Sequence, residues 1–229
     1  MKIGGWQKVS LVDYPGKICT ILFAQGCNFR CPYCHNPELV LPSLFKTALR
    51  TGPIFAYLEK RKGIIDGVTI TGGEPTIQAD LTALIARIKE LGYLVKLDTN
   101  GSRPGVLKEL IGRGMLDYIA MDIKGPLERY GDITRTPVVS EDIRESVQVI
   151  MGSGVPCEFR TTVVESLLAE KDFEQIGRLI RPAPLYTLQH FIPSKALDPA
   201  YLQEAPTSEE YLSRLKALLE NDIQMVEVR

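Results

Sequence analysis

Short apolar runs, rich in β-branched and aromatic residues, recur along the chain and alternate with longer stretches of helical periodicity. Apolar runs of roughly four to eight residues between turn signals are typical of strands. The pattern predicts strands at residues 18–24, 67–71, 93–99, 118–123, 157–164 and 185–191, with a further candidate at 223–228.

The stretches between these runs carry apolar residues at helical spacing, which indicates amphipathic helices. Two clear stripes are Leu81, Leu84, Ile85, Ile88 and Leu91, and then Ile143, Val147, Ile150 and Met151. Before the last helix, Thr207 and Glu210 fit a capping box. The apolar stripe of that helix is Tyr211, Leu212, Leu215, Leu218 and Leu219.

Alternation of strands and helices predicts an α/β fold with a mainly parallel sheet, either open or curled into a barrel. Six strand–helix units are too few for a complete eight-fold barrel. No internal repeat or low-complexity tract divides the sequence, so we expect one domain over residues 1–229. In such folds functional groups gather where strands end. Glycine and polar residues stand at four of the predicted ends: 26–27, 72–75, 98–101 and 122–124.

The composition is that of an ordinary globular protein, with 45% hydrophobic and 24% charged residues. A net charge of −1, from 27 Lys and Arg against 28 Asp and Glu, argues against a nucleic-acid or membrane partner. No apolar run approaches the roughly 18 residues of a membrane span, and the first residues lack a secretory apolar region. We therefore expect a cytoplasmic protein, in which cysteines serve metal binding or redox chemistry rather than disulfides.

Three of the five cysteines, Cys27, Cys31 and Cys34, lie within eight residues of one another. The pair Cys31 and Cys34 alone would suit a glutaredoxin-like dithiol. With His35, the same pair matches a c-type haem attachment sequence. All three cysteines with His35 would form a Cys₃His zinc site, which is cramped because His35 directly follows Cys34. The fourth reading is an iron–sulfur cluster held by three thiolates, with one iron left open for a substrate.

The other two cysteines, Cys19 and Cys157, lie within apolar strands, where a free cysteine is most often a small buried hydrophobic residue. They are expected to pack in the core and to bind no metal.

The spacing Cys27, Cys31, Tyr33 and Cys34 resembles the CxxxCxΦC motif of the radical S-adenosylmethionine (radical SAM) superfamily, in which Φ is aromatic. Within it the chain resembles the activases of glycyl radical enzymes, closest to the short activating proteins of anaerobic ribonucleoside-triphosphate reductase. The segments that carry the resemblance are residues 10–16, 26–36, 72–75, 98–101 and 121–124.

The resemblance implies a partial (β/α)₆ TIM-like barrel, with a [4Fe-4S] cluster bound by Cys27, Cys31 and Cys34 in the loop after the first parallel strand. SAM would chelate the open iron and be cleaved to a 5′-deoxyadenosyl radical, with a flavodoxin- or ferredoxin-type protein as electron donor. Residues 37–65 contain no cysteine, so one cluster is expected.

By the same resemblance, the Gly72-Gly73 backbone and Glu74 bind the methionine amine of SAM, and Lys124 binds its carboxylate. Asp122 and Lys124 are two apart in a strand and share a face, and a buried charged pair of this kind needs a partner. A self-contained ion pair between the two residues is the structural alternative.

Asp98 and Asn100 also share a face. In related activases, residues matching Asp98, Thr99 and Asp122 help to hold a monovalent cation beside the SAM carboxylate. Oxygen ligands suit such a cation. Helix capping by Asn100 would explain that residue equally well.

Three further residues complete the expected cofactor site. Tyr33 would pack near the adenine, although a core aromatic is the alternative. Arg160 could reach the SAM carboxylate or the partner's backbone, or form an ion pair inside the barrel. His190, at a strand end, would touch the SAM ribose, although a lone histidine is usually structural.

The leading hypothesis is therefore an enzyme that makes a glycyl radical on a partner protein. A second is a radical SAM enzyme that acts on a small molecule, such as a purine-like ring in modified-nucleoside synthesis. A third is a zinc-stabilised binding module without enzymatic activity.

Overall fold

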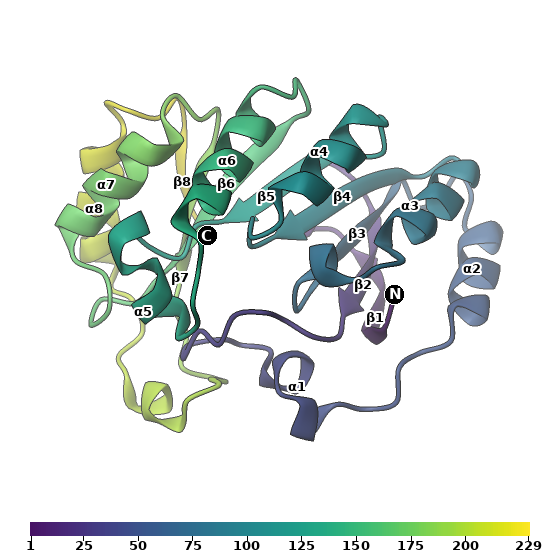
Figure 1. Cartoon of the computed structure of the whole chain (residues 1–229), viewed down its shortest axis with the longest axis horizontal. Helices are drawn as coiled ribbons and strands as arrows, with labels where there is room; N and C mark the ends of the chain where they lie inside the picture. Colours follow the sequence, from purple (N-terminus) through teal and green to yellow (C-terminus); the bar gives the residue numbers. More distant parts are fainter.

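The computed structural model describes all 229 residues, and its strands form a single sheet (Figure 1). The sheet has eight strands in the order in which they occur in the sequence. They are β1 Ile3–Ser10, β2 Cys19–Ala24, β3 Gly67–Gly72, β4 Leu94–Thr99, β5 Tyr118–Asp122, β6 Cys157–Val163, β7 Tyr186–His190 and β8 Val226–Val228. β1 runs antiparallel to β2, and every other neighbouring pair is parallel.

Helices connect the parallel strands. They are α1 Pro37–Val40, α2 Thr51–Lys60, α3 Leu81–Glu90, α4 Pro104–Gly112, α5 Tyr130–Thr134, α6 Ser140–Met151, α7 Glu170–Ile180 and α8 Glu209–Leu219. Short 3₁₀ turns lie at Pro42–Leu44, Pro75–Ile77, Leu127–Arg129 and Pro199–Gln203. None of the helices is long and apolar enough to cross a membrane.

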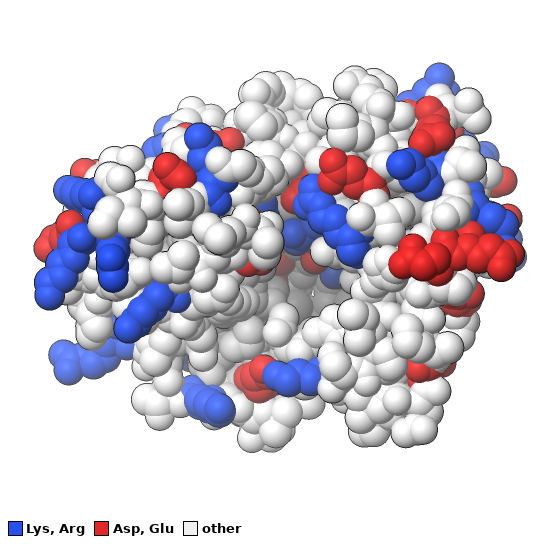
Figure 2. Space-filling view, turned by 180° about the vertical axis from the view of Figure 1, so that it is seen from behind, with Lys and Arg blue, Asp and Glu red and all other residues white.

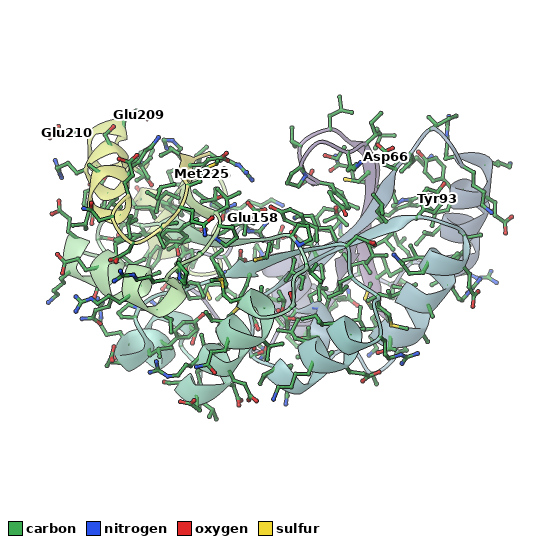
Figure 3. All side chains as sticks on the ribbon, turned by 90° about the horizontal axis from the view of Figure 1, so that it is seen from above. Asp66, Tyr93, Glu158, Glu209, Glu210 and Met225 are labelled. Atoms are coloured by element: carbon green, nitrogen blue, oxygen red, sulfur yellow. The ribbon has the colours of Figure 1, made fainter.

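The strand order fixes the shape of the molecule. Because each crossover moves to the next strand in the same direction, right-handed connections place the helices on one face of the sheet. Figures 1 and 3 show these helices along the convex side of a curved sheet. The sheet remains open between its edge strands β1 and β8. The predicted α/β fold with six consecutive parallel strands, β2 to β7, is confirmed, as is the additional C-terminal strand.

Alternation along the strands separates two environments. On the convex side, residues such as Val95, Leu97, Ile119 and Phe159 are fully buried beneath the helices. Their neighbours in the sequence point to the concave side, where Glu158, labelled in Figure 3, is one example. The concave side therefore carries polar and charged residues without disturbing the apolar core.

Strand β1 was not predicted from the sequence. Its segment begins with Ile3-Gly4-Gly5 and has several exposed positions in a row, so neither alternation nor a continuous apolar run marks it. Its pairing with β2, rather than its own composition, makes it a strand.

The capping box predicted at Thr207 and Glu210 is wrong. The N-cap of α8 is Ser208, whose Oγ accepts a hydrogen bond from the Tyr211 N–H. Thr207 is buried and used elsewhere: its hydroxyl donates to the Val163 carbonyl and accepts from the Phe191 N–H. A tertiary partner thus outweighs local capping at this residue.

Candidate active site

A cavity opens at the carboxyl ends of the parallel strands β2 to β6. Twelve of the fourteen predicted site residues line it: Cys27, Cys31, Tyr33, Cys34, Gly72, Gly73, Glu74, Asp98, Thr99, Asn100, Asp122 and Lys124. Phe29, Val40 and Thr71, which the sequence hypotheses did not place in the site, line it too. So do Thr162 and the two residues that were given no role, His35 and Asn36. The face seen in Figure 2 is hollowed at its centre, with acidic and basic side chains inside the hollow.

The cysteine-bearing loop follows β2 directly and is held by its own backbone and by Arg30. The Arg30 guanidinium donates to the Cys27 and Phe29 carbonyls at 2.7 and 2.8 Å. The Cys34 N–H bonds the Cys31 carbonyl at 3.1 Å. These bonds fold the loop so that all three thiols line the cavity.

The three thiols are largely shielded from solvent. Burial, with the Glu74 carboxylate adding to the effect, raises the pKa of Cys27 to about 12, and burial raises the pKa of Cys31 to about 11. The pKa of Cys34 is raised for the same reason, and the Lys124 ammonium opposes the rise at all three. The thiols are therefore protonated at neutral pH until a metal replaces the protons.

The arrangement of the thiols distinguishes between the metal hypotheses. A tetrahedral zinc ion would draw its ligands to about 2.0–2.3 Å from a single point. No three His, Cys, Asp or Glu side chains are grouped closely enough to hold one ion. An iron–sulfur cluster takes its thiolates on different irons, so its ligands lie further apart. Three thiols that line one cavity without converging on a single point suit a cluster better than a single zinc ion.

The glycine pair after β3 packs against the cysteine-bearing loop. A Cβ on Gly73 would lie 2.0 Å from the Gly26 carbonyl oxygen, and Gly72 has a φ of +109°. No other residue type allows both features. The N–H groups of Gly73 and Glu74 donate to the Ala24 and Gly26 carbonyls, each at 2.8 Å. The glycines thus join the ends of β2 and β3 at the cavity wall.

Glu74 joins the ends of β3 and β4. Its side chain is fully buried, and its carboxylate accepts from the Thr76 N–H at 2.9 Å, the Thr99 hydroxyl at 2.8 Å and the Asn100 N–H at 2.7 Å. The Thr76 hydroxyl also donates to it. Burial raises the pKa of Glu74, and these four donors hold it down. The Glu74 carboxylate thus holds the loop after β3 and the end of β4 together through hydrogen bonds.

The strands β4 to β6 carry a row of charges at the cavity floor and directly behind it. The Arg160 guanidinium bonds Asp122 at 2.8 Å and Asp98 at 3.3 Å. The Lys124 ammonium bonds Asp122 at 3.1 Å, and the Lys96 ammonium bonds Asp98 at 2.5 Å. Burial alone would raise the pKa of Asp122, but Arg160 and Lys124 hold it at about 2. Lys96, which the sequence did not single out, belongs to this row.

Tyr33 supplies an unused polar group. Its ring is buried, it lines the cavity, and its hydroxyl is the one buried side-chain polar atom in the chain with no hydrogen-bond partner. Buried hydroxyls are rarely left unpaired, so this group fits a site completed by a bound ligand.

Two predicted residues do not line the cavity. Arg160 contributes through Asp98 and Asp122 rather than directly. The His190 Nε2 lies 3.4 Å from a Glu209 carboxylate oxygen. The proposed contact of His190 with the SAM ribose stays a prediction.

A segment distant in sequence packs on the outside of the cysteine-bearing loop. It follows β7, comprises residues 192–203, and is the yellow-green stretch at the lower left of Figure 1. The Ile192 carbonyl lies 3.0 Å from the His35 Nε2, and the Asp198 N–H donates to the Pro32 carbonyl at 2.8 Å. No local sequence signal predicts this contact.

Comparison with known proteins agrees with this site. The family model of the Radical SAM superfamily matches residues 21–180. A Methanocaldococcus jannaschii protein named "Putative glycyl-radical enzyme activating enzyme" is 34% identical over 99% of this chain and 95% of its own length. The pyruvate formate-lyase-activating enzyme of Clostridium pasteurianum is 36% identical over 54% of this chain and 52% of its own length.

The structure of Streptococcus suis SuiB bound to precursor peptide SuiA matches 91% of this chain and 48% of SuiB, with a TM-score of 0.69 and 13% identity. This similarity shows a shared fold. The chain belongs to the radical SAM superfamily of enzymes, which confirms the resemblance found in the sequence. Membership implies a [4Fe-4S] cluster and SAM as cofactors.

Proposed function

We propose that this protein is an activating enzyme that generates a glycyl radical on a partner protein. The observation that carries the proposal is the similarity, over nearly the full length of both chains, to a protein named as such an activating enzyme. The three thiols around one cavity supply the required cluster site.

Cys27, Cys31 and Cys34 would hold the cluster, leaving one iron for SAM. When bound, the cluster supplies the electron that cleaves the sulfonium of SAM into methionine and a 5′-deoxyadenosyl radical. The protein's part is to fix the reactants, because such a radical must be formed within contact of its target.

The charges at the strand ends orient the ligand. Lys124 lies beside the thiols and the Asp122 carboxylate, where its ammonium can bind the carboxylate of SAM. The Gly72-Gly73 turn also lines the cavity, where its backbone carbonyls could accept from the methionine amine. The Tyr33 hydroxyl can donate to the ligand while its ring packs on the adenine.

The open cavity suits a protein substrate. A glycine-bearing loop could approach the cavity from the carboxyl ends of the strands, where the cavity opens. One hydrogen atom would pass from the glycine Cα to the 5′-deoxyadenosyl carbon, leaving the radical on the glycine. We propose an anaerobic ribonucleotide reductase-like partner, a flavodoxin- or ferredoxin-type donor, and a cytoplasmic location.

The test uses the cluster-loaded protein, reduced and supplied with SAM under anaerobic conditions. Mixed with candidate glycyl radical enzymes, it should give a doublet electron paramagnetic resonance signal on one of them. One 5′-deoxyadenosine should form per radical. If every candidate stays silent while a small metabolite drives 5′-deoxyadenosine release, the activase proposal is wrong and a small-molecule substrate replaces it.

A further inference from the structure

The row of charges on the cavity floor has more positive than negative members. It contains three cations, Lys96, Arg160 and Lys124, and two carboxylates, Asp98 and Asp122. Exposure of the Lys96, Asp98 and Arg160 side chains is only 2%, 12% and 13%. These five side chains sum to +1 in a poorly solvated place, where the positive charges favour an anionic group of a ligand, such as a carboxylate. The buried Glu74 carboxylate, which lines the same cavity, is held by its own four donors and is not part of this row.

Each carboxylate oxygen of Asp98 and Asp122 that could bind an alkali-metal ion already accepts a hydrogen bond from a cationic side chain. Asp98 gives one carboxylate oxygen to Lys96 and the other to Arg160. Asp122 gives one to Arg160 and the other to Lys124. The Thr99 hydroxyl donates to Glu74 and accepts from the Gly101 N–H at 3.1 Å. A bound cation would compete with these cationic partners for the carboxylates and would raise the charge of the row to +2, which disfavours the cation predicted from the resemblance.

Lys96 is the cation that gives the row its net positive charge and occupies one oxygen of Asp98. Register places it between Thr69 on β3 and Tyr118 on β5, on the concave side of the sheet. Its ammonium lies 2.5 Å from Asp98 and 5.8 Å from the centre of the Tyr118 ring. Lys96 precedes Asp98 by two residues on β4, so the two side chains share the concave face. Asp98 lines the cavity and Lys96 does not.

We propose that the Lys96 ammonium supplies the monovalent positive charge beside Asp98, so that the enzyme binds SAM without a bound alkali-metal ion. Lys96 is a positioning residue: it acts on the ligand through Asp98 and the Arg160–Asp122 pair. The inference rests on SAM being the ligand, which superfamily membership implies, and not on the identity of the radical's target.

The test measures SAM affinity by calorimetry on the cluster-loaded protein, at constant ionic strength, in potassium, sodium or tetramethylammonium chloride. The wild type should bind equally in all three salts, because its site needs no small cation. Lys96→Met should bind roughly tenfold more weakly or worse in tetramethylammonium, since Asp98 then lacks one partner. Potassium or sodium should restore most of this loss by entering the vacated position.

Two variants serve as controls. Lys96→Arg should keep the salt-independent binding, because it retains the charge. Lys108→Met removes an exposed lysine that pairs with Glu145 on the surface, and should behave as wild type in every salt. A wild-type affinity that rises severalfold on adding potassium would overturn the proposal, even if Lys96→Met does not fold. The proposal would also be overturned if Lys96→Met lost the same amount of SAM affinity in all three salts, so that neither potassium nor sodium restored binding.

Discussion

The two faces of the sheet share the same strands but carry opposite chemistry. On β6, Phe159 points to the convex side and is fully buried among apolar residues under the helices, whereas Arg160, the next residue, points to the concave side and bonds two carboxylates. On β4, Leu97 and Asp98 divide in the same way. Successive side chains of a strand point to opposite faces of the sheet. Every second residue of a strand therefore packs in the core, and the residues between them face the ligand site.

This comparison teaches that the two properties can be changed separately. Substitutions on the convex side should mainly lower the free energy of unfolding. Substitutions on the concave side or in the cysteine-bearing loop should mainly change cofactor binding, with a smaller effect on stability. The predictions below test that separation.

The largest effect is expected at the cysteine-bearing loop. Cys27→Ala removes one of only three available thiolates, so cluster incorporation and all SAM cleavage should be lost. The far-ultraviolet circular dichroism of the metal-free protein should not change, because the loop lies outside the sheet. Full iron incorporation by this variant would show that another residue holds the cluster.

Phe159→Ala should have the largest effect on stability. Deleting a fully buried phenylalanine typically costs about 3–5 kcal/mol, through lost transfer free energy and the cavity left behind. Denaturant unfolding of the metal-free protein measures the change. Arg160→Gln is the matched variant on the other face. It should lower the free energy of unfolding less than Phe159→Ala does, and it should weaken SAM binding. Equal effects of both variants on stability would break the separation of the two faces.

Lys124→Met should weaken SAM binding by about tenfold, because it removes the ammonium and keeps the aliphatic stem. Calorimetry on the cluster-loaded protein is the measurement. Unchanged affinity would mean that Lys124 serves only its ion pair with Asp122.

The Asp122 pKa gives a smaller effect on stability. The pKa falls from its ordinary value of 3.8 to about 2 in the folded protein, so the ion pairs stabilise the fold fully only above about pH 5. This contribution is lost as the pH falls through about 2. Between pH 5 and 2.5, the free energy of unfolding should fall less for Asp122→Asn than for the wild type. Parallel curves for the two proteins would contradict the assigned pKa.

The smallest effect on the cluster is expected at the cysteines of the strands. Cys19 and Cys157 are buried and lie outside the cavity lining. Replacing either with alanine should leave the iron and sulfide content unchanged. A loss of iron comparable to that of Cys27→Ala would assign the replaced cysteine to the site.

Much of this arrangement is readable from the sequence, for physical reasons. Apolar runs predict β2 to β7 because those strands are buried, and the cysteine spacing predicts the metal loop because ligands from one loop must be close in sequence. Lys96 was missed because a lysine within an apolar run shows no partner until Asp98 and Arg160 are brought together. The contact between residues 192–203 and His35 joins segments some 160 residues apart, which no local pattern encodes.

The central claim is that Cys27, Cys31 and Cys34 hold an iron–sulfur cluster to which SAM binds. The most direct test is anaerobic reconstitution, followed by metal and sulfide analysis and by electron paramagnetic resonance of the reduced protein with and without SAM. The account predicts about four irons and four sulfides per chain, and a spectrum that changes when SAM is added. Stoichiometric zinc with no iron uptake would contradict it.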